Sequence, residues 1–468
     1  MHFFSMQYHL VILGCQMNQS DAERVHAILA KMGLIYTESE DNASIIGIIA
    51  CSVRQKAIDK VYSKISKWNK WKNKKSLITF VSGCILPDDH KKFLKLFDLV
   101  FDMKELAALP MMLNHYGVVS PISLLSVPEN FEENFVIKSG INIFKGLQPL
   151  SKVKSTPQTW EVDPIYDSNF EAFIPIQNGC NKFCSFCAVP YTRGREVSRP
   201  SKEILEELKS LVEKGYKSIT LLGQNVNSYG LDKRSSERSF AQLLDNVGNI
   251  ADSSNNDIWI YFTAPHPRDM TREVIETIAK HPSLAKQIHL PIQSGDDNIL
   301  ERMNRKHNVE RYAETVSWIR ELIPTATLFT DIIVGFSGET DEQFENTRKA
   351  VRRFGFNMAY TAMYSPRPGA AAFEWGDSIS HQTKKRRYAT LTEDIAEVAL
   401  ESTKKMLNTN VKILVREKDR KEGYLSGHTE GRIVARFPST DINLIGKFVE
   451  IKIESVTPFS VEGGVVSG

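Results

Sequence analysis

The sequence has few cysteines and no strong excess of either charge. Its 468 residues include 6 cysteines, and 59 Lys and Arg residues stand against 56 Asp and Glu residues, which gives a formal net charge of +3. So few cysteines in so long a chain exclude a small disulfide-stapled scaffold. The mild charge identifies no partner, so any case for nucleic-acid binding must rest on local charge.

Long apolar runs are also missing. No stretch of about 18 apolar residues occurs, and residues 1–14 lack the basic start and the apolar length of a signal peptide. We therefore expect a cytoplasmic protein without a membrane segment. Because cytoplasmic thiols stay reduced, we expect the cysteines to ligate metal or to take part in catalysis.

The hydrophobic pattern divides the chain into three expected domains. Residues 1–150 alternate apolar strands with helices, which predicts a three-layer α/β domain with a parallel sheet. Residues 165–398 hold six strand-like runs between helices, which predicts a partial (β/α)6 barrel. Residues 400–468 form short alternating strands with Gly turns, which predicts a small antiparallel β-barrel. Residues 149–157 have the composition of connecting chain.

Three cysteines lie close together in the segment GCNKFCSFC, directly after the first barrel run. Cys180, Cys184 and Cys187 have the spacing C-x3-C-x2-C, and Gly179 before them gives the backbone freedom. Three thiolates can hold three corners of a cubane cluster, which leaves one iron open to a small chelating molecule. Zinc is the alternative, but it needs a fourth ligand, and no Cys or His follows within the next dozen residues.

The other three cysteines follow the first three strands of the chain. Cys15, Cys51 and Cys84 are more than 30 residues apart in sequence, yet each comes at the end of a strand. Ligands of open α/β sheets bind beyond the carboxyl ends of the strands, so these thiols are expected to converge on a second cluster with an open iron. The alternative is three buried structural cysteines.

The first cysteine motif resembles that of the radical S-adenosylmethionine (SAM) superfamily, which has an aromatic residue before the last cysteine, here Phe186. This resemblance implies that SAM chelates the open iron and is cleaved to methionine and a 5′-deoxyadenosyl radical. It also implies that LLGQN at 221–225 binds the methionine part and that DIIVGFSGE at 331–339 contacts the adenine, although either could be a structural turn. The implied SAM contacts are Phe186, Gly223, Gln224, Asn225, Gln293, Ser294, Asp331, Val334 and Gly335.

The whole arrangement resembles the radical SAM methylthiotransferase family, and the resemblance covers nearly the full chain. Segments such as GCQMNQSDAER, CNKFCSFCAVPYTRGREVSRP, LLGQNVNSYG and YSPRPGAAA are most similar to the bacterial MiaB type. The resemblance implies two [4Fe-4S] clusters, SAM, and a C-terminal TRAM barrel associated with RNA. Ile49 and Ala50 before Cys51, and Ile85 and Leu86 after Cys84, depart from the family pattern near the second cluster but leave its ligands in place.

Local positive charge predicts the RNA contacts. Between residues 54 and 75 nine Lys or Arg residues accompany one acid, with two tryptophans interleaved, which suits phosphates and unpaired bases. A solvated helix face is the alternative. The candidate contacts are Arg193, Arg195, Arg199, Lys67, Trp68, Lys70 and Trp71.

The MiaB resemblance implies methylthiolation of carbon 2 of N(6)-isopentenyladenosine beside the tRNA anticodon, with no catalytic residue beyond the cluster ligands. We expect the anticodon stem-loop, a reductant protein and a sulfur source as partners, and a monomeric chain. Threonylcarbamoyl-adenosine in tRNA or a ribosomal-protein aspartate is the alternative target. A non-enzymatic iron-sulfur RNA-binding or sensor protein is the alternative from another class.

Overall fold

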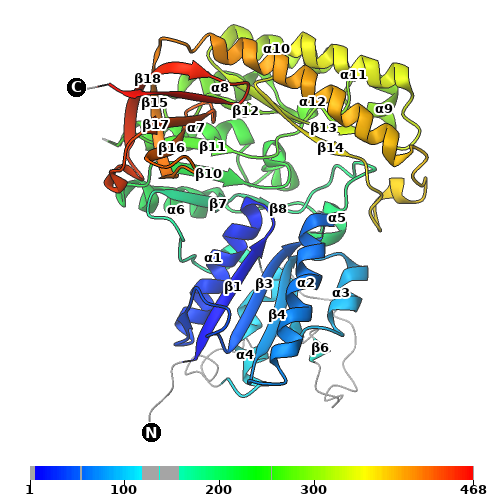
Figure 1. The fold of residues 1–468 in the computed structure, drawn as a ribbon, viewed down its shortest axis with the longest axis vertical. Coiled ribbons are helices and arrows are strands. Elements are labelled where there is room, and N and C mark those ends of the chain that lie inside the picture. Colours follow the sequence, from blue (N-terminus) through cyan, green and yellow to red (C-terminus); the bar gives the residue numbers. More distant parts are fainter. Residues whose placement is uncertain (1–5, 53–54, 119–135, 138–157, 255, 467–468) are drawn as a thin grey trace. The chain divides into compact units, whose positions relative to one another are not determined.

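The computed structural model describes residues 6–52, 55–118, 136–137, 158–254 and 256–466. The chain forms two compact units (Figure 1). The first runs to Asp167 and includes Tyr191–Arg193, and the second comprises Ser168–Pro190 and the chain from Gly194 onward. The expected connecting chain at 149–157 and the boundary near 150 lie outside the described residues, and the three-domain limits stay a prediction. No helix among the described residues is long and apolar enough to cross a membrane.

The first unit is built on a six-stranded sheet with the order β2-β1-β3-β4-β5-β6. Its pairs are parallel except the last, β5 with β6, which is antiparallel. The strands are β1 (Gln7–Leu13), β2 (Ile35–Tyr36), β3 (Ile45–Cys51), β4 (Ile78–Cys84), β5 (Leu99–Val100) and β6 (Val136–Ile137). The three apolar runs predicted as strands are β1, β3 and β4.

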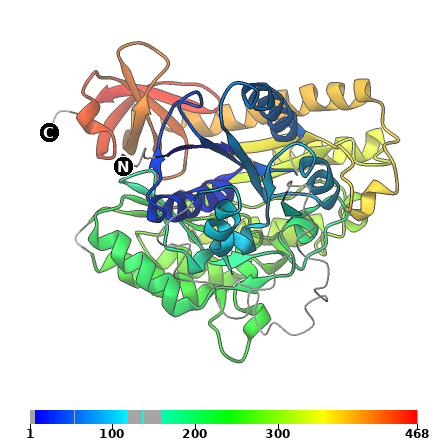
Figure 2. The ribbon, with the colours of Figure 1, turned by 90° about the horizontal axis from the view of Figure 1, so that it is seen from below.

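Helices cover both faces of this sheet, as Figure 2 shows for α1 (Gln16–Lys31) and α2 (Gln55–Trp71). Side chains alternate along β3, so Ile45 packs in the core beneath α1, whereas Ile46 packs in the core beneath α2. The other helices in the described part of this unit are α3 (Pro87–Phe93), η1 (Met103–Ala108), α4 (Leu109–Asn114) and η3 (Thr159–Glu161). The predicted three-layer α/β architecture is confirmed.

The second unit contains the six parallel strands expected of the partial barrel. They form two sheets, β11-β10-β7 and β12-β13-β14, which an isolated parallel bridge between Ile260 and Leu284 joins. The strands are β7 (Glu171–Pro175), β10 (Ser218–Leu222), β11 (Trp259–Phe262), β12 (Gln287–His289), β13 (Thr327–Val334) and β14 (Met358–Met363). Each coincides with one of the predicted runs. A short pair, β8 (Gln177–Asn178) with β9 (Val197–Ser198), lies beside them.

Helices alternate with these strands, as the predicted (β/α) pattern requires. They are α5 (Val189–Thr192), α6 (Ser201–Glu213), η4 (Val226–Ser228), η5 (Leu231–Lys233), α7 (Phe240–Asp252), η6 (Pro267–Asp269), α8 (Arg272–Lys280), α9 (Asp297–Arg302), α10 (Val309–Leu322), α11 (Asp341–Phe354), η7 (Ala371–Phe373) and α12 (His381–Lys404). Side-chain caps begin several of them: Ser239 accepts from the N–H of Gln242 at the start of α7, and Thr340 accepts from that of Gln343 at the start of α11. This part of the chain is the predicted partial barrel.

A closed five-stranded barrel follows in the same unit, with the order β15-β16-β17-β19-β18. Its elements are β15 (Asn410–Lys418), β16 (Tyr424–Thr429), β17 (Val434–Pro438), η8 (Ile442–Leu444), β18 (Phe448–Val456) and β19 (Ser460–Val465). All pairs are antiparallel except β17 with β19, which is parallel, so the predicted antiparallel barrel is confirmed with this one difference. The parallel pair closes the barrel because β18 intervenes in sequence and lets β19 return beside β17 in the same direction.

This small barrel packs against the amino ends of the parallel strands. Trp259, the first residue of β11, meets Phe448 edge-on with ring centroids 4.6 Å apart. Glu171, the first residue of β7, forms an ion pair with Arg416. The carboxyl ends of the strands, where (β/α) barrels carry their active sites, are therefore left to the loops that hold the candidate site.

Candidate iron-sulfur and SAM site

The loop of Cys180, Cys184 and Cys187 follows β7 and β8 at the carboxyl end of the sheet. Gly179 begins this loop with φ of +79°, and a Cβ there would lie 2.1 Å from the carbonyl oxygen of Arg195. Its N–H donates to Oε1 of Gln224, 2.5 Å away, just beyond β10. Glycine is therefore required by both conformation and space.

The thiols of this loop lie in a buried environment. Cys180 and Cys184 are each 9% exposed, and Arg305 donates from Nη1 to Sγ of Cys184 at 3.4 Å. Burial and the neighbouring Cys184 thiol raise the pKa of Cys187 to about 12, and burial also raises that of Cys180 to about 11. At neutral pH these two thiols stay protonated until a metal displaces their protons, so loading this site with a cluster releases protons.

No group of three or more His, Cys, Asp and Glu side chains among the described residues converges closely enough to hold a single ion. A mononuclear zinc site would need a fourth ligand beside the three thiolates, with Zn–S distances of about 2.3 Å. A [4Fe-4S] cluster attaches each of three thiolates to a different iron and does not need that convergence. The cluster is the group that the donor set fits.

The residues that the resemblance assigns to SAM gather at the carboxyl ends of β10, β12 and β13. Asn225 and Ser294 are buried, at 1% and 0% exposed. Gln293 has φ of +74° and pairs with Ile332 by an isolated parallel bridge. Gly223 and Gln224 follow β10, Asp331 and Val334 belong to β13, and Gly335 follows β13. Phe186 packs against the group of buried hydrophobic side chains that includes Phe336. As SAM contacts these residues stay predictions.

Two buried polar atoms beside the cysteine loop have no hydrogen-bond partner among the described residues. They are Nε2 of Gln177 and Oδ1 of Asn225, in side chains that are 0% and 1% exposed. The backbone N–H of Asn225 donates to Oε1 of Gln177 at 3.3 Å, so the two side chains are neighbours. A buried polar atom without a partner is costly, and a polar ligand such as SAM would satisfy both.

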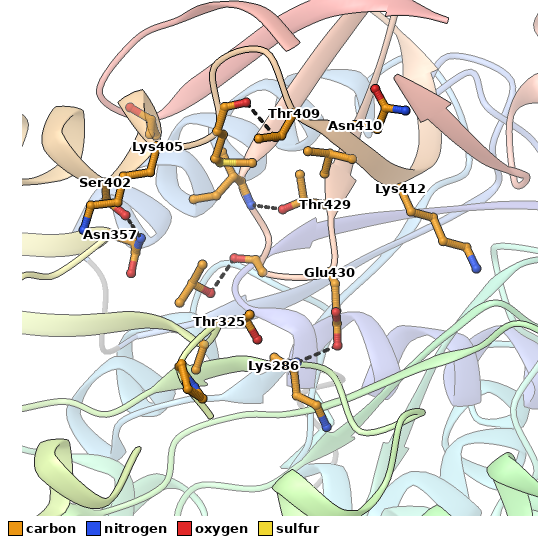
Figure 3. A pocket seen from close by; sticks show the side chains of 18 of the residues that line it. Lys286, Thr325, Asn357, Ser402, Lys405, Thr409, Asn410, Lys412, Thr429 and Glu430 are labelled. Atoms are coloured by element: carbon orange, nitrogen blue, oxygen red, sulfur yellow. Dashed lines mark hydrogen bonds between the residues drawn. The ribbon is translucent and has the colours of Figure 1, made fainter. Parts of the chain in front are cut away.

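A separate cavity of about 560 Å³ lies where the small barrel meets the partial barrel (Figure 3). Its wall includes Lys286, which precedes β12, and Asn357, which precedes β14. Asn357 donates to Oγ of Ser402 at 2.6 Å, and the backbone N–H of Lys286 donates to Oε1 of Glu430 at 3.0 Å. Because these residues lie at the amino ends of the strands, this cavity is not the site of the cysteine loop.

The second cysteine set lies in the first unit. Cys51 and Cys84 end β3 and β4 and are partners in the parallel register, and Cys15 is the N-cap of α1, two residues after the end of β1. Asn18 links the set: its Oδ1 accepts from the N–H of Cys15 at 3.2 Å, and its Nδ2 lies 3.2 Å from the carbonyl oxygen of Ala50 and 3.8 Å from Sγ of Cys84. Asn18 thus contacts Cys15 and Cys84, and Cys51 lies beside Cys84 as its register partner.

One arginine reaches this second set. Residues 191–193 belong to the first unit, and Arg193 donates from Nε to Sγ of Cys84 at 2.9 Å. Its other nitrogens pair with both carboxylate oxygens of Asp21, at 3.3 and 2.5 Å. The hydrogen bond that the Cys84 thiol makes with Cys51, together with burial, raises the pKa of Cys84, whereas the charge of Arg193 acts to lower it.

The candidate RNA contacts are divided between exposed and buried positions. Arg195, Lys67 and Lys70 are exposed, and Lys67 lies 4.5 Å from the centre of the half-buried Trp71 ring. Trp68 is 0% exposed and donates to Glu40 at 3.1 Å, and Arg199 is 6% exposed and forms an ion pair with Glu207. Stacking of Trp68 on a base would require its indole to leave the core. As RNA contacts all these residues stay predictions.

Sequence reasoning did not single out Asn18, Asp21 or Arg305. Asn18 follows Cys15 by three residues, which is the spacing of a capping box, so this signal was present in the sequence. Asp21 lies one helical turn further along α1. Arg305 is 121 residues from its partner Cys184, and no local pattern predicts such a contact.

Family models match all three parts of the chain. The model described as "Radical SAM superfamily" matches residues 174–351, "Uncharacterized protein family UPF0004" matches residues 7–102, and "TRAM domain" matches residues 404–466. Among solved structures, the chain is similar to the radical SAM methyltransferase TsrM from Kitasatospora setae, with a TM-score of 0.52 and 14% identity over 79% of this chain and 74% of that one. That likeness concerns the fold alone. The fold, the cysteine loop and the matched models define a radical SAM enzyme.

Two curated relatives give the family more narrowly. The tRNA-2-methylthio-N(6)-dimethylallyladenosine synthase of Actinobacillus pleuropneumoniae serotype 5b (strain L20) is 36% identical over 98% of this chain and 92% of its own length. The protein of the same name from Clostridium botulinum (strain Langeland / NCTC 10281 / Type F) is 36% identical over 98% of this chain and 96% of its own. The chain belongs to the radical SAM methylthiotransferase family, in the MiaB-type branch that these synthases represent.

Proposed function

We propose that this protein transfers a methylthio group to carbon 2 of N(6)-isopentenyladenosine in tRNA, next to the anticodon. It uses SAM and [4Fe-4S] clusters as cofactors. The two relatives are named for this reaction, and the chain is similar to them over nearly their full lengths. The observation that carries the proposal in the structure is the presence of two separate three-cysteine sets, each at the carboxyl ends of a parallel sheet.

The chemistry of the target explains the need for both sets. Carbon 2 of adenine carries no acidic proton, so a general base cannot activate it. With the cluster of Cys180, Cys184 and Cys187 in place, an electron is available for reductive cleavage of SAM, and the second cluster supplies a site for the transferable sulfur. Two cysteines of each set are buried and the third is partly buried, which limits the access of water to reactive species.

The protein's own residues then have positioning roles. We infer that Asn225 and Gln177 turn their unpartnered atoms toward the polar groups of SAM, because both are buried beside the cysteine loop. Arg305 donates to Cys184, and its Nη2 also donates to the carbonyl oxygen of Pro291 at 2.7 Å, which fixes the guanidinium. These residues orient ligands and do not exchange protons with the substrate.

The tRNA must bring an unstacked base to the carboxyl ends of the strands. We infer that the exposed Arg195, Lys67 and Lys70 contact phosphates and that Trp71 offers part of its ring for stacking. The TRAM barrel adds an RNA-associated domain. Anticodon-loop bases are already largely unpaired, so displacing one costs little. We further infer that the chain acts as a monomer in the cytoplasm, with a separate reductant protein and sulfur source.

Mass spectrometry of nucleosides tests this function. Isopentenylated tRNA would be incubated anaerobically with the reconstituted protein, SAM, a reductant and sulfide. We expect a 2-methylthio product that is lost in Cys184→Ala and in Cys51→Ala, and that does not form on tRNA lacking the isopentenyl group. Cleavage of SAM without modified tRNA would contradict the substrate and favour the alternative targets, threonylcarbamoyl-adenosine or a ribosomal-protein aspartate. Clusters without SAM cleavage would indicate an iron-sulfur sensor.

A further inference from the structure

Arg193 and Asp21 form a buried ion pair beside one thiol of the second cysteine set. Their side chains are 3% and 2% exposed, and the guanidinium meets both oxygens of the carboxylate. This fork leaves the Nε–H free to point elsewhere, and it points at Sγ of Cys84 at 2.9 Å. The geometry needs the planar arrangement of an arginine, because a lysine ammonium has no second rigid donor direction.

Arg193 is the member of this ion pair that lies next to the cysteine sulfur. Three cysteine thiolates that hold a [4Fe-4S] cluster bring negative charge into a site in which Cys51 and Cys84 are buried. One carboxylate and one guanidinium cancel each other, but only the guanidinium touches the sulfur. The nearest fixed charge to the cluster ligand is therefore positive, and Asp21 lies on the far side of it.

We propose that Arg193 is a positioning residue of the second cluster: oriented by Asp21, its guanidinium donates to the Cys84 sulfur and raises the reduction potential of the cluster that the cysteine holds. This inference deepens the proposed function and rests on its assignment of Cys15, Cys51 and Cys84 as cluster ligands. Hydrogen bonds to cluster sulfurs and nearby charges are the means by which proteins tune such potentials. A cation favours the reduced cluster because that state carries one more negative charge.

This role differs from the RNA contact that the arginine-rich segment alone suggests. A phosphate contact requires a guanidinium that reaches solvent, whereas this one is almost completely buried and already has three acceptor atoms. Its neighbour Arg195 is exposed and lies over the Phe183 ring with the guanidinium carbon 4.6 Å from the ring centre. Two residues of the same segment therefore serve different purposes.

The test uses the full chain with Cys180, Cys184 and Cys187 all replaced by Ala, so that only the second cluster remains. Iron content, electron paramagnetic resonance and a redox titration would be compared for this parent and for Arg193→Gln and Arg193→Lys in it. The matched control is Lys72→Gln, which breaks an ion pair with Asp98 near the opposite end of β4. Thermal unfolding of the metal-free proteins monitors the fold.

We expect Arg193→Gln to shift the ratio of oxidised to reduced cluster at least tenfold toward the oxidised form at a fixed ambient potential. This corresponds to a potential lower by about 59 mV for one electron. Arg193→Lys keeps the positive charge but not the forked geometry, so its potential should fall in the same direction but by less than in Arg193→Gln. Lys72→Gln should keep the parent's potential. Loss of the cluster in Arg193→Gln also supports the proposal if the metal-free variant unfolds like the control.

Three results would overturn the inference. The first is a full cluster with an unchanged potential in Arg193→Gln, which would show that the contact is only structural. The second is a shift of the potential in Lys72→Gln as large as that in Arg193→Gln. The third is a metal-free Arg193→Gln chain that is unfolded. If Arg193→Gln binds tRNA more weakly at an unchanged cluster potential, the role of Arg193 is an RNA contact. If the parent itself binds no cluster, the assignment of the second set fails, which is a failure of the proposed function.

Discussion

Cys51 and Cys84 are direct register partners at the ends of two neighbouring parallel strands, β3 and β4. Two strand ends and one helix start are among the most rigid places in an α/β unit, so the sheet itself fixes how far apart the thiols lie. Gly83 beside Cys84 has φ of +114°, and a Cβ there would lie 2.3 Å from the carbonyl oxygen of Ala50. The two strands approach closely at the cysteines because one of them carries no side chain there.

Asn18 is expected to be essential for this second set. Asn18→Ala leaves the N–H of Cys15 and the carbonyl of Ala50 without their side-chain partner in a site where Asn18 is 0% exposed. We expect the free energy of unfolding to fall by about 1–3 kcal/mol and iron bound by the second set to fall at least by half. Chemical denaturation and iron analysis would measure both. A variant that binds iron fully would show that the cysteines do not depend on this link.

Gly179→Ala tests the first cysteine loop. Alanine at this position meets the backbone of Arg195 at 2.1 Å in addition to the strain of a positive φ. We expect a loss of most of the iron bound by Cys180, Cys184 and Cys187, measured in a chain that lacks the second set. Gly194→Ala is the matched control, since Gly194 has φ of +78° and open space around its Cβ position. Equal losses in both variants would show that strain alone, and not the clash, disrupts the loop.

The strands, and the placement of the second cysteine set at strand ends, were predictable because both depend on local sequence. Each of the six barrel strands is a short apolar run, and each cysteine of the second set directly follows such a run or ends it. The burial of Trp68 also had a local signal, since Ile58, Val61, Ile65 and Trp68 recur at helical spacing on one face of α2. Reading the lysine-rich face and not this apolar face of the helix made Trp68 a candidate for RNA stacking.

Other features could not be predicted because they join residues far apart in the chain. The contact of Arg193 with Cys84 spans 109 residues, and its geometry depends on Asp21 holding the guanidinium. The parallel pairing of β17 with β19 depends on closure of the whole barrel and not on either strand's sequence. Long-range polar contacts of this kind carry no periodicity that a sequence would reveal.

Arg432 is expected to hold the TRAM barrel against the partial barrel. Its guanidinium lies 3.9 Å from the centre of the Tyr261 ring on β11 and donates to Oγ1 of Thr220 on β10 at 3.1 Å. Arg432→Ala should lower the free energy of unfolding by about 1–3 kcal/mol through loss of the cation–π contact and the hydrogen bond. Denaturant unfolding would be compared with Arg420→Ala, which removes an exposed arginine from the same barrel. No difference between the two variants would refute this role.

His428 is expected to make the second unit less stable in mild acid. Nη1 of Arg416 donates a hydrogen bond to its Nδ1 at 3.2 Å, so Nδ1 is the acceptor and carries no proton of its own. Burial, with Arg416 and Arg432 nearby, lowers the pKa of His428 to about 3. An unfolded histidine titrates near pH 6.5, so between about pH 6.5 and 3 the unfolded chain binds a proton that the folded chain does not. This contribution to stability is complete above pH 6.5 and is lost progressively as the pH falls below it.

His428→Gln separates this effect from general acid unfolding, because glutamine can still accept from Arg416 but does not titrate. We expect the loss of unfolding free energy between pH 7 and 5 to be smaller in the variant by about 1 kcal/mol, which allows for partial exposure of the ring. Denaturant unfolding at the two pH values would measure it, with His381→Gln at the exposed start of α12 as the control. The result against this prediction is an equal loss of unfolding free energy between pH 7 and 5 in His428→Gln, His381→Gln and the unmodified chain. The ring of His428 would then take up a proton in the folded protein, and the contact with Arg416 would not hold it neutral.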